Sequence, residues 1–293
     1  MKIHILGSGT PTPSLERMGA GYLIQIDNDI ILLDCGPGTY HRLLQLGVDI
    51  TKVSHLFLSH LHYDHCLDYV RLFLTRWDQG AGLIPELNVY GPPPLQQMND
   101  RLFSERGAFA FDIEARTKHE GSIGIFMARG GSPPRKWPEP NVLEITEKDE
   151  IRGDYWVIKP FEVKHMQPYL TCYGYKLVTE DGVLIYSGDT RPCKNLEETA
   201  TDCDVLIHMC QFISGTVKES STTGSTGHRE LAELAERAKV KNLVVSHINR
   251  QMDVPGIRER IIAEMSHIFK GTIYWGKDLM EIPMKTPGPK PYA

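Results

Sequence analysis

Features that would place a protein in a membrane or on the secretory route are missing from this sequence. No stretch reaches the roughly 18 consecutive apolar residues that a membrane-spanning helix needs. The first residues, MKIHILGSGTPTP, lack the basic start, the apolar stretch and the small-residue cleavage site of a signal peptide. We therefore expect a cytoplasmic protein without membrane contact.

Cysteine pairs and basic clusters are also scarce. The six cysteines form no CxxC pair, and a chain of this length does not need disulfides for stability, so we expect reduced thiols. The net charge is −5 and no long run of lysine and arginine occurs, so tight binding of nucleic acid would need a local basic patch. The 293 residues are enough to bury a substantial core.

Short apolar runs bounded by turn residues recur along the chain and predict buried strands. They are KIHIL, YLIQI, IILLD, SHLFLS, LNVYG, GVLIYSGD, DVLIH and NLVVSH. Helical spacing of apolar residues appears at 39–48, 67–77, 228–240 and 254–269. Strands and helices therefore interleave, which predicts an α/β fold with sheets covered by helices rather than an all-β barrel.

The segment 107–150 does not show this alternation of strands and helices and is expected to be an insertion. It contains ARGGSPPRKWPEPN, which is rich in glycine and proline. The segment is either a surface excursion or a lid that contacts substrate through Arg135, Lys136 and Trp137. The last residues, KTPGPKPYA (285–293), are expected to form a poorly ordered end.

The stretch LSHLHYDHCLD, residues 58–68, concentrates metal-binding side chains directly after a predicted strand. Imidazole nitrogen and carboxylate oxygen are suitable ligands for zinc and similar metals. Such groups cannot be buried without partners, because each would lose its hydration. Groups so close in sequence fit two neighbouring ions better than a single ion. They are His60, His62, Asp64 and His65.

Two ions need further ligands, and the ends of strands are where rigid sites are presented. Three later strand ends carry suitable side chains, although each alone has an ordinary surface, turn or core interpretation. They are His165 in FEVKHMQPY, Asp189 in VLIYSGDTRP and His247 in NLVVSHINR. The sequence therefore predicts a binuclear site built from distant segments.

Together these motifs resemble the metallo-β-lactamase superfamily of binuclear hydrolases. The resemblance rests on HxHxDH at 60–65, on LDCGPG before it and on the three later ligands. LGSGTPTP near the start and SGDTRP around Asp189 are similar to its ribonuclease Z and arylsulfatase-like branch. The resemblance implies a four-layer αβ/βα sandwich over residues 1–293, as one domain with the insertion, and with the metals at one edge between two sheets.

The resemblance also implies roles for individual residues. Zinc is the expected metal, with manganese or iron as alternatives. Asp34 in LLDCGPG would hold loops or ligating histidines by hydrogen bonds. Asp64 would orient the attacking water and accept its proton. The implied ligand sets are His60, His62 and His165 for one ion, and Asp64, His65 and His247 for the other, with Asp189 as the bridge.

Departures from the ribonuclease Z pattern bear on the substrate. The His-Glu pair of those proteins is replaced by His208 and Met209, and Ser225 stands near the position of a further family histidine. The arm that they extend for transfer RNA between the third histidine and the bridging aspartate has no room in residues 166–188. His208 and His228 are candidates for substrate contact or leaving-group protonation, or else for packing roles in the core and at a helix start.

These observations favour a hydrolase that uses a metal-activated hydroxide on phosphoric or sulfuric esters of small molecules, with side activity on lactones or β-lactams. The alternative is a ribonuclease Z-type endonuclease that processes the 3′ end of tRNA, which makes RNA the less favoured partner. A flavin-linked redox protein is a third interpretation, but we expect no flavin-binding domain. A non-catalytic scaffold would require a missing ligand, and all seven expected ligands are present. A homodimer is compatible with the sequence.

Overall fold

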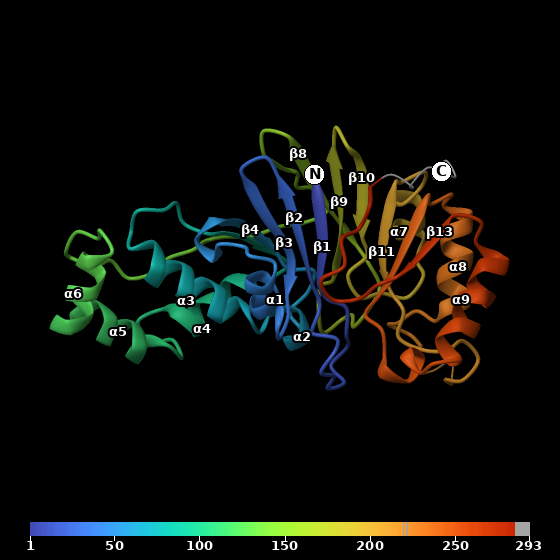
Figure 1. The fold of residues 1–293 in the computed structure, drawn as a ribbon, viewed down its shortest axis with the longest axis horizontal. Helices are drawn as coiled ribbons and strands as arrows, with labels where there is room; N and C mark the ends of the chain where they lie inside the picture. The colour runs from blue at the N-terminus through green and yellow to red at the C-terminus, as the bar shows by residue number, and fades with distance from the viewer. Residues whose placement is uncertain (219, 221, 285–293) are drawn as a thin grey trace, which may run out of the picture.

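The computed structural model describes residues 1–218, 220 and 222–284. Within this part of the chain the strands form a sheet of six strands and a sheet of seven, which pack face to face (Figure 1). The first has the order β1-β2-β3-β4-β5-β6 and the second has the order β13-β12-β11-β10-β9-β8-β7. Our expectation for the tail, residues 285–293, lies outside the described residues.

The first sheet is made by the strands that come before residue 145. They are β1 (Lys2–Gly7), β2 (Gly21–Ile26), β3 (Asp29–Cys35), β4 (Val53–Phe57), β5 (Asn88–Gly91) and β6 (Asn141–Glu144). The second sheet is made by the later strands. They are β7 (Ile151–Arg152), β8 (Trp156–Glu162), β9 (Tyr173–Thr179), β10 (Gly182–Tyr186), β11 (Val205–Met209), β12 (Asn242–Ser246) and β13 (Thr272–Trp275).

Helices lie between and after these strands. Those in the first half are α1 (Thr39–Gln45), α2 (Tyr63–Cys66), α3 (Tyr69–Gly80), α4 (Leu95–Phe103), α5 (Ala110–Lys118) and α6 (Glu120–Ala128). Those in the second half are α7 (Lys194–Thr199), α8 (His228–Arg237) and α9 (Ile257–Ile268). No helix among the described residues is long and apolar enough to cross a membrane.

Three buried clusters of apolar side chains define four layers. The cluster between the sheets joins residues such as Ile5 and Phe57 of the first sheet to Ile158 and Val244 of the second. A second cluster joins the outer face of the first sheet to α1, α3 and α4, and a third joins the outer face of the second sheet to α7, α8 and α9. The alternation of strand residues between two faces produces this layering. The predicted helix-covered α/β sandwich is confirmed.

The segment 107–150 contains regular structure that its glycine and proline content does not reveal. Its helices α5 and α6 project from the body of the molecule beside α3 and α4 (Figure 1). Strand β6, near the end of the segment, pairs with β5 as the edge of the first sheet. The segment therefore includes both a projecting helix pair and a part of the sheet.

Two of the three side chains that the lid alternative would use, Arg135 and Trp137, make packing contacts with the body of the protein. Trp137 packs against the core cluster of the first sheet, and its indole Nε1 donates a hydrogen bond to the carbonyl of Phe103 at 2.6 Å. The guanidinium of Arg135 lies 3.9 Å from the ring centre of Trp77 and donates to Asp78 at 2.8 Å. These contacts fasten the segment to α3 and α4, which favours the surface excursion over the lid.

Asp78 is the anchor of the projecting helices, because it accepts hydrogen bonds or ion pairs from three arginines. They are Arg116, Arg129 and Arg135. The side chain of Arg135 is almost entirely buried, so removal of its partner leaves a buried charge uncompensated. Asp78 therefore stabilises the junction of α3 with α5 and α6.

We predict that Asp78→Ala lowers the free energy of unfolding by about 3 kcal/mol, the cost of breaking a buried ion pair. Asp112→Ala is the matched control, because Asp112 pairs with Arg116 at the surface and should cost less than about 1 kcal/mol. Chemical denaturation measures both values, and hydrogen exchange should show faster opening of residues 107–137 in Asp78→Ala. Equal losses in the two variants would contradict this assignment.

Candidate metal centre

The histidine-rich stretch lies where β4 leaves the first sheet. The chain turns after Phe57, passes His60 and His62, and enters the short helix α2, which carries Asp64 and His65. Because the extended turn and the helical turn orient consecutive side chains differently, groups only a few residues apart can face a common point. All four of these side chains are buried except that of His62, which is partly exposed.

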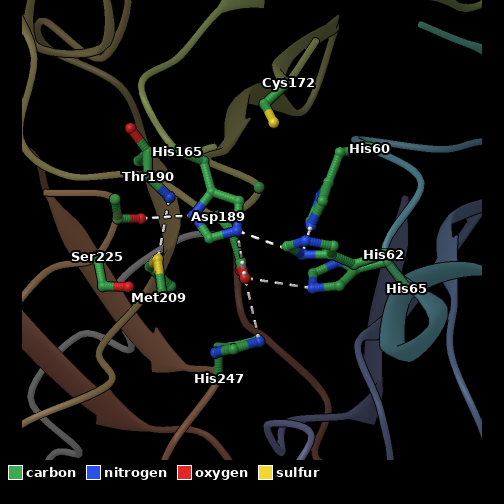
Figure 2. A network of polar contacts seen from close by, with 12 residues as sticks. His60, His62, His65, His165, Cys172, Asp189, Thr190, Met209, Ser225 and His247 are labelled. Atoms are coloured by element: carbon green, nitrogen blue, oxygen red, sulfur yellow. Dashed lines mark hydrogen bonds and ion pairs between the residues drawn. The ribbon is translucent and has the colours of Figure 1, made fainter. Parts of the chain in front are cut away.

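Three further groups reach the same place from the second sheet. His165 follows β8, Asp189 follows β10 and His247 follows β12. Figure 2 shows their side chains pointing toward the histidines of the first sheet, with Asp189 in the middle. His247 has a φ of 50°, a left-handed conformation that few residues other than glycine adopt. Such strain at a strand end is typical of a functional position.

The donor atoms of these residues form three overlapping groups, each with its donor atoms within 4.8 Å of one another. All seven residues that the sequence predicted as ligands belong to at least one group. The groups are His60, His62 and His165, then His60, His65 and Asp189, and then Asp64, His65 and His247.

Asp189 lies at the centre of the cluster. Its Oδ2 atom is 3.4 Å from Nε2 of His65, 3.3 Å from Nε2 of His247 and 3.8 Å from Nε2 of His165. Burial alone would raise the pKa of this carboxyl, but the charges of His247 and His65 hold the pKa well below its usual range. Asp189 is therefore an anion placed between the two sets of imidazoles.

The donor atoms fit a bound cation better than they fit one another. Nε2 of His65 is buried and makes no hydrogen bond within the described structure, although it lies 3.5 Å from Asp64 and 3.4 Å from Asp189. Nδ1 of His62 lies 3.0 Å from Nε2 of His60 and 3.3 Å from Nε2 of His165. A single shared proton cannot satisfy three converging ring nitrogens, whereas a divalent metal accepts lone pairs from all three.

Buried polar contacts behind the cluster hold the ligands in place. Nδ1 of His65 donates to Oδ2 of Asp34 at 2.7 Å, and Nδ1 of His165 donates to the carbonyl of Gly224 at 2.6 Å. In each ring this bond leaves Nε2 free to face the cluster. Asp34 thus has the supporting position that the family resemblance implied, while the contact with Gly224 was missed because no sequence signal connects residues so far apart.

His208 and His228 are not brought to the cluster. Alternation along β11 places His208 on the face of Leu206, against the helices, and its Nδ1 donates to the carbonyl of Met209. Burial lowers the pKa of His208 to about 4. His228 accepts a hydrogen bond from the backbone of Ser214 and donates to Glu264 on α9 at 3.0 Å. Neither ring belongs to the groups of converging donor atoms, although the charge of Asp189 opposes the effect of burial on the pKa of His208.

The two positions at which the sequence departs from ribonuclease Z do lie beside the cluster (Figure 2). The sulfur of Met209 accepts a hydrogen bond from the backbone of Thr190, next to Asp189. The hydroxyl of Ser225 is 3.2 Å from the side chain of Gln211. A neutral thioether and a hydroxyl thus stand where the resemblance implied an acid and an imidazole.

A family model and several known proteins match this chain. The model of the metallo-beta-lactamase superfamily matches residues 16–247. A ribonuclease Z from Methanothermobacter thermautotrophicus is 24% identical, with 97% of each chain covered. A ribonuclease Z from Mycobacterium bovis is 27% identical, with 96% of this chain and 98% of that protein covered.

Solved structures show the same fold. The metallo-beta-lactamase fold protein YhfI from Bacillus subtilis has a TM-score of 0.73 at 17% identity, over 96% of this chain and 99% of its own. The short form of human tRNase Z has a TM-score of 0.68 at 17% identity, over 98% of this chain and 100% of its own. A diphosphatase of the PhnP family has a TM-score of 0.65 at 16% identity, over 96% of both chains. Because the family model spans most of the chain, the protein belongs to the metallo-beta-lactamase superfamily and is a metal-dependent hydrolase.

Proposed function

We propose that this protein hydrolyses phosphodiester bonds at a centre of two divalent cations, with zinc as the native metal. The observation that carries the proposal is the gathering of seven imidazole and carboxylate groups, six of them buried, with Asp189 at their centre. One ion would be held by His60, His62 and His165, the other by Asp64, His65 and His247, and Asp189 would contact both.

Divalent cations at these groups would supply Lewis acidity, which lowers the pKa of water and neutralises charge on a phosphoryl group. The residues of the chain contribute orientation and proton transfer. Asp64 lies 3.3 Å from Nε2 of His247. Burial would raise the pKa of Asp64, but its hydrogen bond with His247 and the charge of His65 keep that pKa low. We assign Asp64 to orient the attacking water and to receive its proton.

The relatives bear on which ester is cleaved. We expected small phosphoric or sulfuric esters first and ribonuclease Z activity second. The curated relatives are ribonucleases Z over nearly the full chain, which favours the second over an arylsulfatase. We therefore propose RNA phosphodiesters as the first candidate substrate, and we drop sulfuric esters.

Small phosphodiesters are the second candidate, and one observation favours them. The residues between His165 and Asp189 form a short turn followed by β9 and β10, so this connection provides no projecting arm. A hydrolase of small phosphodiesters needs no such arm, because it contacts one or two phosphates rather than an RNA backbone.

A cavity near the strand end that carries His247 has room for part of a substrate, although none of the seven donor residues lines it. It has a volume of about 510 Å3 and includes Ile248, the neighbour of His247, together with Thr10, Ser14 and Arg250. Arg250 is exposed and lies three residues after His247. We propose that Arg250 binds a phosphate oxygen that is not at the reacting centre.

We predict two zinc ions per chain and a larger loss of metal in Asp189→Ala than in His165→Ala or His247→Ala, because Asp189 would contact both ions. Elemental analysis of the purified proteins measures the content, with Asp154→Ala as an exposed carboxylate control. A single ion in active wild-type protein, or two retained ions in Asp189→Ala, would refute the binuclear assignment.

We predict turnover of bis(p-nitrophenyl) phosphate and none of p-nitrophenyl sulfate, since phosphodiester cleavage is the proposed reaction. A precursor tRNA with a 3′ trailer is the deciding third substrate, followed by gel electrophoresis. Cleavage at one site supports the RNA assignment, whereas cleavage of the small diester alone supports the second candidate. Hydrolysis of the sulfate but neither diester would overturn the proposal.

We predict that Arg250→Ala raises KM for a phosphodiester about tenfold, which corresponds to about 1.4 kcal/mol of binding, without loss of metal. Arg101→Ala on α4 is the control, because Arg101 is also exposed but lies outside the cavity. Steady-state kinetics with both variants tests the role of the cavity. An unchanged KM in Arg250→Ala would place the phosphate elsewhere.

A further inference from the structure

One carboxylate, Asp34, lies behind both halves of the candidate metal centre. It is at the end of β3 and is completely buried. Its φ of 60° is in the left-handed region, which is uncommon for a residue other than glycine. Strain of this kind persists only where surrounding contacts maintain it, so the contacts of Asp34 indicate what its position is for.

Four donors surround this carboxylate. The backbone N–H of Ser59 donates to Oδ1 at 2.7 Å. The Ser59 hydroxyl and Nδ1 of His65 each donate to Oδ2 at 2.7 Å, and the hydroxyl of Tyr186 donates to the same oxygen. An ionised carboxylate has about four acceptor sites, so these donors compensate for its burial. Burial and the charge of Asp34 also raise the pKa of Tyr186, which keeps its donor proton.

The Ser59 hydroxyl extends the network to the other ligand group. Its oxygen lies 3.0 Å from Nδ1 of His60. Because its single proton is given to Asp34, this oxygen accepts the Nδ1–H of His60, which leaves Nε2 of His60 unprotonated. Asp34 fixes the same tautomer in His65 directly. The two histidines belong to different proposed ions, so one carboxylate orients a ligand of each.

We infer that Tyr186 and Ser59 are positioning residues that couple the two metal sites through Asp34. Tyr186 holds Oδ2 of Asp34 in the orientation that accepts the hydrogen bond from His65. Ser59, whose hydroxyl is held by Asp34, orients the ring of His60. Tyr186 comes from β10 of the second sheet, whereas Asp34, Ser59 and both histidines come from the first. The hydrogen bond from Tyr186 to Asp34 therefore also connects the two sheets at the centre. This inference rests on the metal binding assigned under the proposed function.

The test compares Tyr186→Phe and Ser59→Ala with Tyr69→Phe. Tyr69 is an equally buried tyrosine whose hydroxyl bonds to Asn99 and has no contact with Asp34. Each protein is stripped of metal and titrated with Co2+ against a chelator, and the visible absorption of bound Co2+ reports the ligand geometry. Hydrolysis is not measured.

We expect Tyr186→Phe and Ser59→Ala to weaken Co2+ binding about 10- to 100-fold, the usual effect of losing a hydrogen-bond partner of a metal ligand. Both should change the Co2+ spectrum, and Tyr69→Phe should change neither quantity. Unchanged binding and spectra in Tyr186→Phe, or equal changes in Tyr69→Phe, would overturn the inference.

The titration, set beside the separate phosphodiester assay of the proposed function, separates this inference from that function. Wild-type protein that binds two Co2+ ions but cleaves no phosphodiester would refute the proposed substrate and leave the positioning roles standing. Wild-type protein that binds no Co2+ would refute the metal assignment and the positioning roles together.

Discussion

The gathering of seven imidazole and carboxylate groups, six of them buried, at the junction of two sheets is the constraint on which the structure depends. Groups of this kind lose hydration when they are buried, and this cost is recovered only by charged partners, hydrogen bonds or a metal. The structure supplies the hydrogen bonds from behind, through Asp34 and Gly224. A divalent cation is the partner that would satisfy the nitrogen atoms that face inward.

The sandwich brings these groups together because strand ends from both sheets meet along one edge. The turn after β4 presents four of the donor groups, and three strands of the second sheet end opposite them. Each sheet alone would expose its donors to solvent. The apolar cluster between the sheets, which includes Phe57 and Ile207, therefore maintains the distances within the centre. Loss of this packing would therefore change the distances between the donor atoms.

The seven donor positions were predictable, because HxHxDH is a dense local pattern and the other donors follow recognisable apolar strands. The network behind them was not. Tyr186 reaches Asp34 across 152 positions of sequence, and nothing local indicates that contact. His208 and His228 were candidates for substrate contact because they lie near family motifs in the sequence. In the structure, His208 bonds to the carbonyl of Met209, and His228 bonds to Ser214 and Glu264. The helices α5 and α6 were not predicted, because their segment contains glycines and its apolar residues do not follow helical spacing.

The donor groups determine the chemistry of the centre, whereas the surrounding elements determine which substrate can reach it. The seven donor groups converge and are supported by Asp34. However, residues 166–188 are occupied by a turn, β9 and β10, and Met209 and Ser225 replace an acid and an imidazole. The element that does project, α5 with α6, leaves the first sheet and is fastened to α3 by Asp78. A long substrate would therefore contact other surfaces of this protein, because no arm projects from the residues just before Asp189. The centre would perform the same hydrolysis, while the surface contacts would decide how much of a nucleic acid is bound.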